Sequence, residues 1–292
     1  MKVIGYFTSW NDELNEDNIN YHYLTHINYA FLIPKEDGSL VKLNYEKINK
    51  LISFSHKNNV KVFISIGGWS YENKKLDVVF EKICDKKEII DIFIKNVMNI
   101  VDEFNFDGID LDWEFPSEKY SSKYEYMVEN FKCKLNACNK QLSIAIPPGI
   151  NVDGRISNIL AITDKVLNAV DWINLMVYDN SSEDNHSSYN YAKISIDYWL
   201  KQRKYLCNKI VLGLPFYSRP NGLMYRDILN CNKNNYFKDY YDGEFYNGKL
   251  TLLKKLELVE KTNCAGVMIW AVNYDTNDEY SLLKVIGDAK EN

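Results

Sequence analysis

Short runs of β-branched and other apolar residues recur along the chain, separated by stretches with helical periodicity. The runs predict eight buried strands, at residues 3–8, 27–32, 60–66, 108–113, 142–146, 172–178, 210–215 and 265–271. Apolar side chains spaced three and four residues apart predict helices over 87–104, 123–136, 194–203 and 251–261. Buried parallel strands are nearly continuous apolar runs, so this alternation predicts βαβ units around a parallel sheet.

Eight such units in 292 residues predict an α/β fold, a single (β/α)8 TIM barrel with one domain over residues 1–292. An open doubly wound sheet is the alternative. It would usually carry a glycine-rich phosphate loop after its first strand, whereas residues 6–10 read YFTSW. The longest interval between strands holds residues 216–249, enough for an elaborate loop but not for an independent α+β domain.

Composition and charge narrow the classes of partner. With 46% apolar and 26% charged residues the chain is an ordinary globular one, and its net charge of −5 disfavours nucleic acid. No run of about 18 apolar residues exists, so no membrane span is predicted. The six cysteines show no CxxC spacing, which favours free thiols. The first residues read as a strand and not as a signal peptide, which leaves two expectations: a cytoplasmic protein, or a secreted one whose leader was removed.

Three acidic residues, Asp110, Asp112 and Glu114, occupy every second position at the end of the fourth predicted strand. Side chains alternate between the faces of a strand, so these carboxyl groups share one face, with about 6.6 Å between neighbours at ~3.3 Å per residue. In a barrel the apolar face packs on the helices and the acids project into the lumen. Glu114 then lies at the carboxyl end of the strand, where barrel enzymes place their active sites.

Carboxyl groups buried together resist ionising, so the set is expected to hold protons tightly and to titrate as a coupled system. A carboxyl group kept protonated near neutral pH is what a general acid needs. An exposed edge strand with acids facing water is the alternative, but the flanking apolar residues indicate a central strand. Asp107 has the opposite parity and is interpreted as structural support.

A metal-dependent hydrolase would also place carboxylates on barrel strands and would normally add histidine ligands at strand ends. The four histidines, His22, His26, His56 and His186, show no paired ligand spacing. The sequence therefore predicts neither a metal nor a cofactor.

The acidic motif resembles the DxxDxDxE signature of glycoside hydrolase family 18, the chitinase family, in a short form without an α+β insertion domain. Four further segments resemble motifs of that family at successive strand ends. They are Ser65-Ile66-Gly67-Gly68, Met176-Val177-Tyr178-Asp179, Gly213-Leu214-Pro215-Phe216-Tyr217 and Val267-Met268-Ile269-Trp270. Together the matches cover nearly the whole chain.

The resemblance implies retaining, substrate-assisted hydrolysis of β-1,4-linked N-acetylglucosamine chains. Glu114 would protonate the glycosidic oxygen, and the sugar's acetamido oxygen would attack its own anomeric carbon to form an oxazolinium ion. Asp112 would orient the acetamido group, Asp110 would support Asp112, and Tyr178 would hydrogen-bond the acetamido oxygen. Glu114 would then deprotonate the incoming water.

The resemblance also implies substrate-binding residues around the cleaved bond. Trp270 would stack beneath the sugar in the −1 subsite, and Asp179 would contact sugar hydroxyls. Aromatic or flanking positions of weaker specificity are Tyr6, Phe31, Trp69, Met176, Tyr217 and Arg219, where core packing is the plain alternative for several.

Structural details follow from the same resemblance. Ser65 is expected to lie near Asp110 and to hydrogen-bond it, and Gly67 and Gly68 to permit close packing of the backbone. Non-proline cis peptides are implied after Ala30, Glu114 and Trp270.

Two segments depart from the commoner pattern of the family. After Asp179 the chain continues Asn180-Ser181-Ser182-Glu183. After the predicted strand at 210–215 it reads Tyr217-Ser218-Arg219-Pro220. With no room for an insertion domain, a shallow, open groove and endo-type or short-oligomer cleavage are expected. The protein is expected to be a monomer. Chitin oligosaccharides, the chitobiose core of N-glycans and peptidoglycan or spore cortex all stay open as substrates. A chitin-binding lectin is the alternative of another class, but lectins of this family lack the acid at the position of Glu114.

Overall fold

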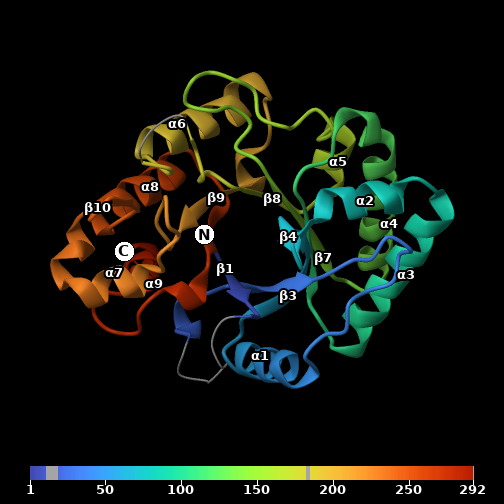
Figure 1. Cartoon of the computed structure of the whole chain (residues 1–292), viewed down its shortest axis with the longest axis horizontal. Coiled ribbons are helices and arrows are strands. Elements are labelled where there is room, and N and C mark those ends of the chain that lie inside the picture. The colour runs from blue at the N-terminus through green and yellow to red at the C-terminus, as the bar shows by residue number, and fades with distance from the viewer. Residues whose placement is uncertain (11–18, 182–184, 292) are drawn as a thin grey trace. The chain divides into compact units, whose positions relative to one another are not determined.

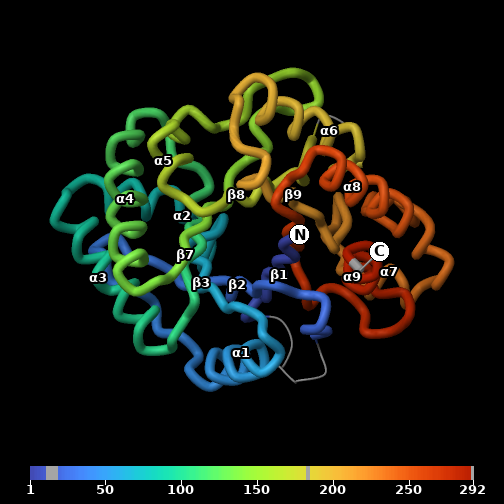
Figure 2. The backbone as a smooth tube through the Cα atoms, turned by 180° about the vertical axis from the view of Figure 1, so that it is seen from behind, coloured from blue at the N-terminus to red at the C-terminus, as the bar shows by residue number. Residues whose placement is uncertain are grey.

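The computed structural model describes residues 1–10, 19–181 and 185–291. Eight parallel strands close into a barrel (Figures 1 and 2). In barrel order they are β1 (Lys2–Thr8), β12 (Gly266–Trp270), β9 (Ile210–Pro215), β8 (Trp172–Leu175), β7 (Gln141–Ile146), β6 (Gly108–Trp113), β3 (Lys61–Gly68) and β2 (His26–Leu32). The predicted (β/α)8 barrel is therefore confirmed.

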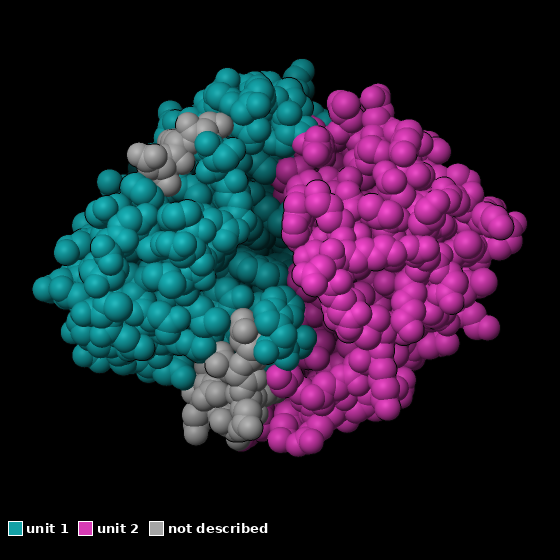
Figure 3. All heavy atoms as spheres, viewed as in Figure 1, with its two compact units in different colours: residues 1–27, 148–157, 174–292 teal, residues 28–147, 158–173 magenta. Residues whose placement is uncertain are grey.

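The chain divides into two compact units, coloured teal and magenta in Figure 3. Unit 2, in magenta, comprises Asn28–Pro147 and Asn158–Ile173 and carries β3, β6, β7 and most of β2. Its helices are α1 (Tyr45–Lys57), α2 (Leu76–Cys84), α3 (Lys87–Glu103), α4 (Ser121–Ala137) and α5 (Asp164–Ala169), and a small hairpin pairs β4 (Ser70–Tyr71) with β5 (Lys74–Lys75).

Unit 1, in teal, comprises Met1–Ile27, Pro148–Ser157 and Asn174–Asn292, and carries β1, β9 and β12. Its helices are α6 (Tyr189–Asp197), α7 (Tyr225–Cys231), α8 (Lys249–Lys261) and α9 (Leu282–Glu291), with a hairpin of β10 (Tyr240–Tyr241) and β11 (Glu244–Phe245). Across the chain, 3₁₀ turns lie at Tyr21–Tyr23, Glu118–Tyr120, Cys207–Lys209, Lys233–Phe237 and Val272–Tyr274, and a π turn at Tyr198–Gln202.

Strand β6 shows why the acids occupy one face. Every residue of β6 is buried. Trp113, on the apolar face, stacks on Phe80 of α2 with ring centroids 5.0 Å apart and meets Tyr124 of α4 edge-on at 5.6 Å. These aromatic contacts add about 0.5–1.5 kcal/mol each to the burial of the rings. The helices therefore hold the apolar face of β6, which leaves the alternate positions to the acids.

Asp107 acts as structural support, as its parity predicts. Its Oδ2 accepts hydrogen bonds from the backbone nitrogen of Val62 at 2.7 Å and from Nε2 of His56 at 2.8 Å. The carboxylate thus connects the end of α1 to the start of β3 within unit 2.

The observed elements differ from the predicted ones in a few places. β8 ends at Leu175 and not at residue 178, because the chain turns there and reaches a left-handed conformation at Asp179, with φ of 59°. α6 begins earlier than predicted, since Ser188 caps it by accepting from the backbone nitrogen of Tyr191 at 3.0 Å. The interval 216–249 holds α7 and the β10–β11 hairpin and no separate domain.

The predicted non-proline cis peptides are confirmed. The peptide bonds Ala30–Phe31, Glu114–Phe115 and Trp270–Ala271 are cis. All six cysteines are free thiols. Among the described residues, none of the helices is both long and apolar enough to cross a membrane.

Candidate active site

The carboxyl group of Asp110 is completely buried and fully engaged. Oδ2 accepts from the hydroxyl of Ser65 at 2.8 Å, and Oδ1 from the hydroxyl of Ser143 at 2.7 Å. The register explains both contacts, because Asp110 pairs with Ser65 across β3–β6 and with Ser143 across β6–β7. The predicted contact with Ser65 is confirmed, and two hydroxyl donors offset part of the cost of burying a charge.

Asp112 lies two residues further along the same face and has a different environment. Its side chain is 2% exposed, and Oδ1 has no hydrogen-bond partner among the described residues. Burial raises the pKa of Asp112 well above its ordinary value, and the charges of Glu114 and Asp110 raise it further. Asp112 is therefore protonated over a much wider pH range than an exposed aspartate.

Glu114 follows the last residue of β6 and is only half-buried. The solvent exposure of the acids therefore increases along this face, from the fully buried Asp110 through Asp112 to Glu114, which solvent can reach. Protons held on such a coupled set belong to the set and not to one residue. This arrangement can deliver a proton at its accessible end and keep a proton-sharing acid behind it.

Two glycines allow the backbone of β3 to approach its neighbours, as expected. Gly67 has φ of +114°, and a Cβ there would lie 2.2 Å from the backbone oxygen of Asp112. Gly68 has φ of +90°, and its Cβ would lie 2.5 Å from the ring of Phe31. Only glycine tolerates both the conformation and the contacts. Phe31, a predicted substrate-binding residue, is half-buried beside Gly68.

Unit 1 holds a second polar cluster around Asp179, which we call the Asp179 cluster: Asp179, His186, Tyr217 and Arg219. The Tyr217 hydroxyl donates to Oδ1 of Asp179 at 2.8 Å, and Arg219 donates through Nε to Oδ1 and through Nη2 to Oδ2, both at 2.8 Å. Nδ1 of His186 lies 3.3 Å from Oδ1. Burial opposes ionisation of Asp179, but the bonds from His186 and Arg219, the charge of Arg219 and the bond from Tyr217 outweigh it and lower its pKa to about 2.

Tyr178 lies beside this cluster, half-buried. Its ring meets Tyr217 edge-on at 6.1 Å, and its hydroxyl is 3.8 Å from the sulfur of Met268. A Cβ at position 213 would lie 2.9 Å from the Tyr178 ring, so Gly213 makes room for it. Met176 is 9% exposed and its side chain is largely packed.

Aromatic side chains also gather around Trp270 at the end of β12. The ring of Tyr6 lies 5.5 Å from that of Trp270, and the hydroxyl of Tyr6 accepts from Nδ2 of Asn174 at 3.3 Å. Trp10, 58% exposed, lies 6.4 Å from Trp270. Trp270 is itself half-buried, so this group combines a buried tyrosine with two accessible indoles. Accessible indole rings are suited to stacking on sugar faces.

Trp69 follows Gly68 in unit 2 and is 53% exposed. The ammonium group of Lys75 lies 4.7 Å from the centre of its ring. Lys75 thus covers one part of the indole through a cation–π contact.

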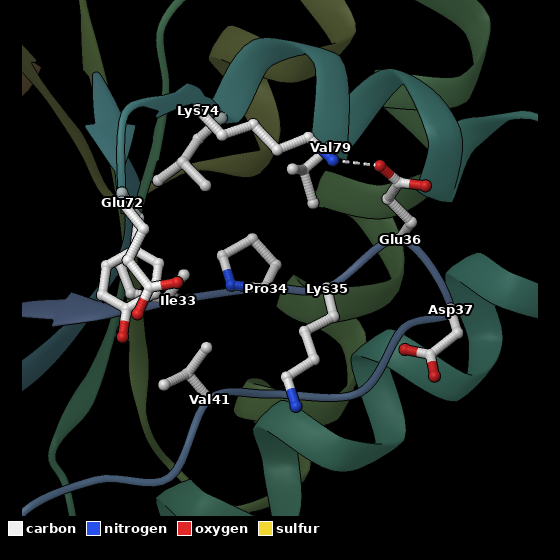
Figure 4. Close-up of a pocket in the computed structure, with 11 residues that line it drawn as sticks. Ile33, Pro34, Lys35, Glu36, Asp37, Val41, Glu72, Lys74 and Val79 are labelled. Carbon is white, nitrogen blue, oxygen red and sulfur yellow. Dashed lines mark hydrogen bonds and ion pairs between the residues drawn. The ribbon is translucent and has the colours of Figure 1, made fainter.

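A separate pocket of about 490 Å³ lies in unit 2, between the loop after β2, the β4–β5 hairpin and the start of α2 (Figure 4). It is lined by Ile33, Pro34, Lys35, Glu36, Asp37, Val41, Tyr71, Glu72, Lys74, Leu76 and Val79. Glu36 and Lys74 form an ion pair beside it (Figure 4). No predicted site residue lines this pocket, and the mixture of apolar groups with both signs of charge favours no particular class of ligand.

Three residues that the sequence analysis did not select contribute to these groups: Ser143, Trp10 and His186. Ser143 interrupts an apolar run at the position paired with Asp110, a signal that needs the strand register. Trp10 is a large aromatic residue two positions after the end of β1, and such a position is itself a usable signal. His186 lies in a polar segment without periodicity. Ser182 and Glu183, part of the departure from the family pattern, lie outside the described residues.

Comparisons with known proteins give one consistent family. The sequence model of Glycosyl hydrolases family 18 matches residues 2–275. The GH18 chitinase ChiB from the chitin utilization locus of Flavobacterium johnsoniae has a TM-score of 0.84 and 30% identity, with 99% of this chain and 93% of that chain covered. A chitinase from Bacteroides thetaiotaomicron has a TM-score of 0.82 and 27% identity, with 99% and 96% covered.

The curated relatives are longer than the segment that this chain matches. Probable chitinase 10 of Drosophila melanogaster is 25% identical over 253 residues, which are 75% of this chain and 11% of that protein. The chain likewise spans 53% of the mouse chitotriosidase-1 that it matches.

Proposed function

The chain belongs to glycoside hydrolase family 18, and we propose that it cleaves β-1,4-linked N-acetylglucosamine chains, chitin or its oligosaccharides, with retention of configuration. The observation that carries the proposal is the graded row of acids on β6, which ends in the accessible carboxyl of Glu114 next to the buried, high-pKa carboxyl of Asp112. Such a row supports a general acid that both gives and takes a proton.

In the proposed mechanism Glu114 donates its proton to the glycosidic oxygen as the bond to the anomeric carbon breaks. The substrate's own acetamido oxygen attacks that carbon and forms an oxazolinium ion, so the protein supplies no nucleophile. Glu114, now ionised, takes a proton from a water molecule as that water attacks the anomeric carbon. The attack opens the oxazolinium ring and gives net retention of configuration. Holding the acetamido group in place replaces a bimolecular step with an intramolecular one.

Asp112 is proposed to hold the acetamido N–H and to stabilise the positive charge of the oxazolinium ion. Its Oδ1, without a partner among the described residues, is free to serve as the acceptor. Asp110, fixed by two serine hydroxyls, supports Asp112 as the inner member of the row. Tyr178 is assigned the hydrogen bond to the acetamido oxygen.

The aromatic groups are proposed to bind the sugar rings. Trp270 would form the floor of the −1 subsite, with Tyr6 and Trp10 beside it, and Phe31 and Trp69 would bind further sugars. Asp179, Tyr217 and Arg219 would contact sugar hydroxyls, and Met176 would add apolar packing. The interval 216–249 holds no insertion domain, which supports endo-type cleavage. The protein is proposed to act as a monomer.

The alternatives divide by substrate and by class. Cleavage of the N-glycan core or of peptidoglycan and spore cortex would use the same acids on another N-acetylglucosamine polymer. A lectin would bind chitin oligomers without cleaving them, but it has no need of an accessible acid at position 114.

A first experiment compares chitooligosaccharides with fully deacetylated glucosamine oligomers of the same length. We expect turnover of the acetylated substrate alone, because the acetamido oxygen is the nucleophile. Product analysis in the first minutes should show the β-anomer. Binding without turnover would identify a lectin. The absence of both would redirect the assay to glycopeptides and cortex fragments, and cleavage of glucosamine oligomers would contradict the mechanism.

A second experiment removes metals. Among the described residues there is no group of three or more His, Cys, Asp or Glu side chains that could hold a metal ion. We expect full turnover of chitooligosaccharides after dialysis against a chelator. Activity that disappears in chelator and returns with a divalent cation would contradict this expectation.

A further inference from the structure

The carboxylate of Asp179 is the common acceptor of the Asp179 cluster. Tyr217 and Arg219 both bind its oxygens at 2.8 Å, and the Arg219 guanidinium also lies 4.9 Å from the centre of the Tyr217 ring. A shift of the Asp179 side chain would therefore move the two neighbouring groups proposed to contact sugar. Asp179 and Arg219 are 43% and 42% exposed, so packing alone does not fix them.

His186 reaches the same carboxylate from the buried side. Its side chain is 2% exposed, and its ring lies 5.2 Å from that of Tyr217. Nδ1 is 3.3 Å from Oδ1 of Asp179 and 3.2 Å from the backbone nitrogen of Asp179. A neutral imidazole nitrogen either donates or accepts, so only one of these contacts can be a hydrogen bond.

Burial of the ring decides between the two tautomers. Nε2 of His186 has no hydrogen-bond partner among the described residues. A proton on Nε2 would leave a buried N–H without an acceptor there and would aim the bare Nδ1 at a carboxylate oxygen. A proton on Nδ1 gives a charge-assisted bond to the Asp179 carboxylate, leaves the Nε2 lone pair unmatched, and releases the backbone N–H of Asp179, which otherwise donates to Nδ1. Asp179 is an exposed residue whose N–H can bind water, whereas a donor on the buried Nε2 has no such partner, so the proton belongs on Nδ1.

The segment that carries His186 is anchored by a buried lysine of α8. Lys255 is completely buried, and its ammonium donates to the backbone oxygen and hydroxyl of Ser187 at 2.7 and 2.8 Å and to Oδ1 of Asn247 at 2.6 Å. The Ser187 hydroxyl in turn donates to the backbone oxygen of Val177 at 2.6 Å. This anchor joins α8 to the segment just after β8 and fixes the residue next to His186.

We propose that His186, held by the Lys255–Ser187 anchor, is a positioning residue that keeps the Asp179 carboxylate aligned with Tyr217 and Arg219 for binding sugar. The proposal rests on the proposed function, because Asp179 and Arg219 are assigned to substrate there. It adds a residue that touches no substrate and acts through Asp179. The substrate-contacting groups of the cluster are thereby organised before any sugar arrives, which lowers the cost of binding.

The kinetic test compares His186→Leu with His186→Asn. Leucine removes the donor, whereas the amide nitrogen of asparagine can take the place of Nδ1. We expect His186→Leu to raise KM for chitooligosaccharides about tenfold, the effect of one lost bond to a charged group, with kcat within about twofold. His186→Asn should restore KM to within about threefold of wild type. Matched controls are His22→Leu and His22→Asn, at an exposed histidine outside the cluster, which should leave KM unchanged.

A second measurement does not depend on activity. In ¹⁵N-labelled wild-type protein, the ring nitrogens of His186 should report a protonated Nδ1 and an unprotonated Nε2. Lys255→Met, if it folds, should raise KM as His186→Leu does, since it releases Ser187. If wild type neither binds nor cleaves chitooligosaccharides, the proposed function fails, and the tautomer still decides whether His186 donates to Asp179. A proton on Nε2 with none on Nδ1, or a wild-type KM in His186→Leu, would overturn the proposal.

Discussion

Replacement of Glu114 by glutamine is expected to lower kcat/KM for chitooligosaccharides by at least ~10²–10⁴-fold, the usual contribution of a general acid. Glutamine has nearly the same size as glutamate but cannot donate a proton to the glycosidic oxygen or take one from water. Both halves of the reaction therefore lose their proton carrier. Binding of the same oligosaccharide, measured by calorimetry, should stay close to that of wild type because the subsites are unchanged.

The matched control is Glu118→Gln. Glu118 is an exposed acid four residues further on, in the 3₁₀ turn after β6, and its replacement should leave kcat and KM unaltered. A Glu114→Gln enzyme that retained more than a tenth of wild-type turnover would remove Glu114 from the role of general acid. Loss of binding together with turnover would show instead that the substitution damaged the site as a whole.

The barrel was predictable because its strands are buried on both faces. β6 and β9 have the predicted bounds, and every residue of both strands is buried. β8 was predicted three residues too long because Met176 and Val177 are apolar, although the backbone turns after Leu175. Apolar character indicates burial, and only the hydrogen bonds show where a strand ends.

The acids on β6 were predictable for a similar reason: a period of two assigns their face without any knowledge of neighbouring strands. Their partners were harder to find. Ser65 was expected from a motif, whereas Ser143 becomes significant only through the pairing of Asp110 with Ser143 across β6–β7. His186 depends on a loop that folds back on Asp179, and nothing in a local pattern of polar residues indicates such a return.

Asp112 and Asp179 show how one residue type is brought to opposite states. Burial beside two other acids raises the pKa of Asp112, whereas three donor side chains lower that of Asp179 to about 2. Environments that separate pKa values in this way commonly assign acid–base chemistry to one group and binding to the other. Asp112 accordingly fits its proposed place in the proton-sharing row, and Asp179 is held as an anion by Tyr217 and Arg219.

Replacement of Asp112 by asparagine should reduce activity and increase stability together. Asparagine cannot pass a proton to the neighbouring acids and become an anion as the oxazolinium ion forms, so kcat is expected to fall about 10²-fold or more, as for other preorganised electrostatic groups. The folded-state pKa of Asp112 is raised, so its contribution to stability is complete below the unfolded value of about 3.9 and is lost as pH rises through the folded value. At pH 7 wild type therefore bears a cost that a neutral asparagine avoids.

Thermal unfolding at two pH values tests this balance. Asp112→Asn should unfold at a higher temperature than wild type at pH 7, with ~2–4 °C for each kcal/mol recovered, and the difference should shrink towards pH 4. Asp107→Asn is the contrasting control, because Asp107 accepts from Val62 and His56 and its replacement should destabilise the fold at pH 7. A variant Asp112→Asn less stable than wild type at pH 7 would mean that the aspartate is ionised and bound there. That result would contradict both the raised pKa of Asp112 and the proposal that the acids at positions 110, 112 and 114 share protons.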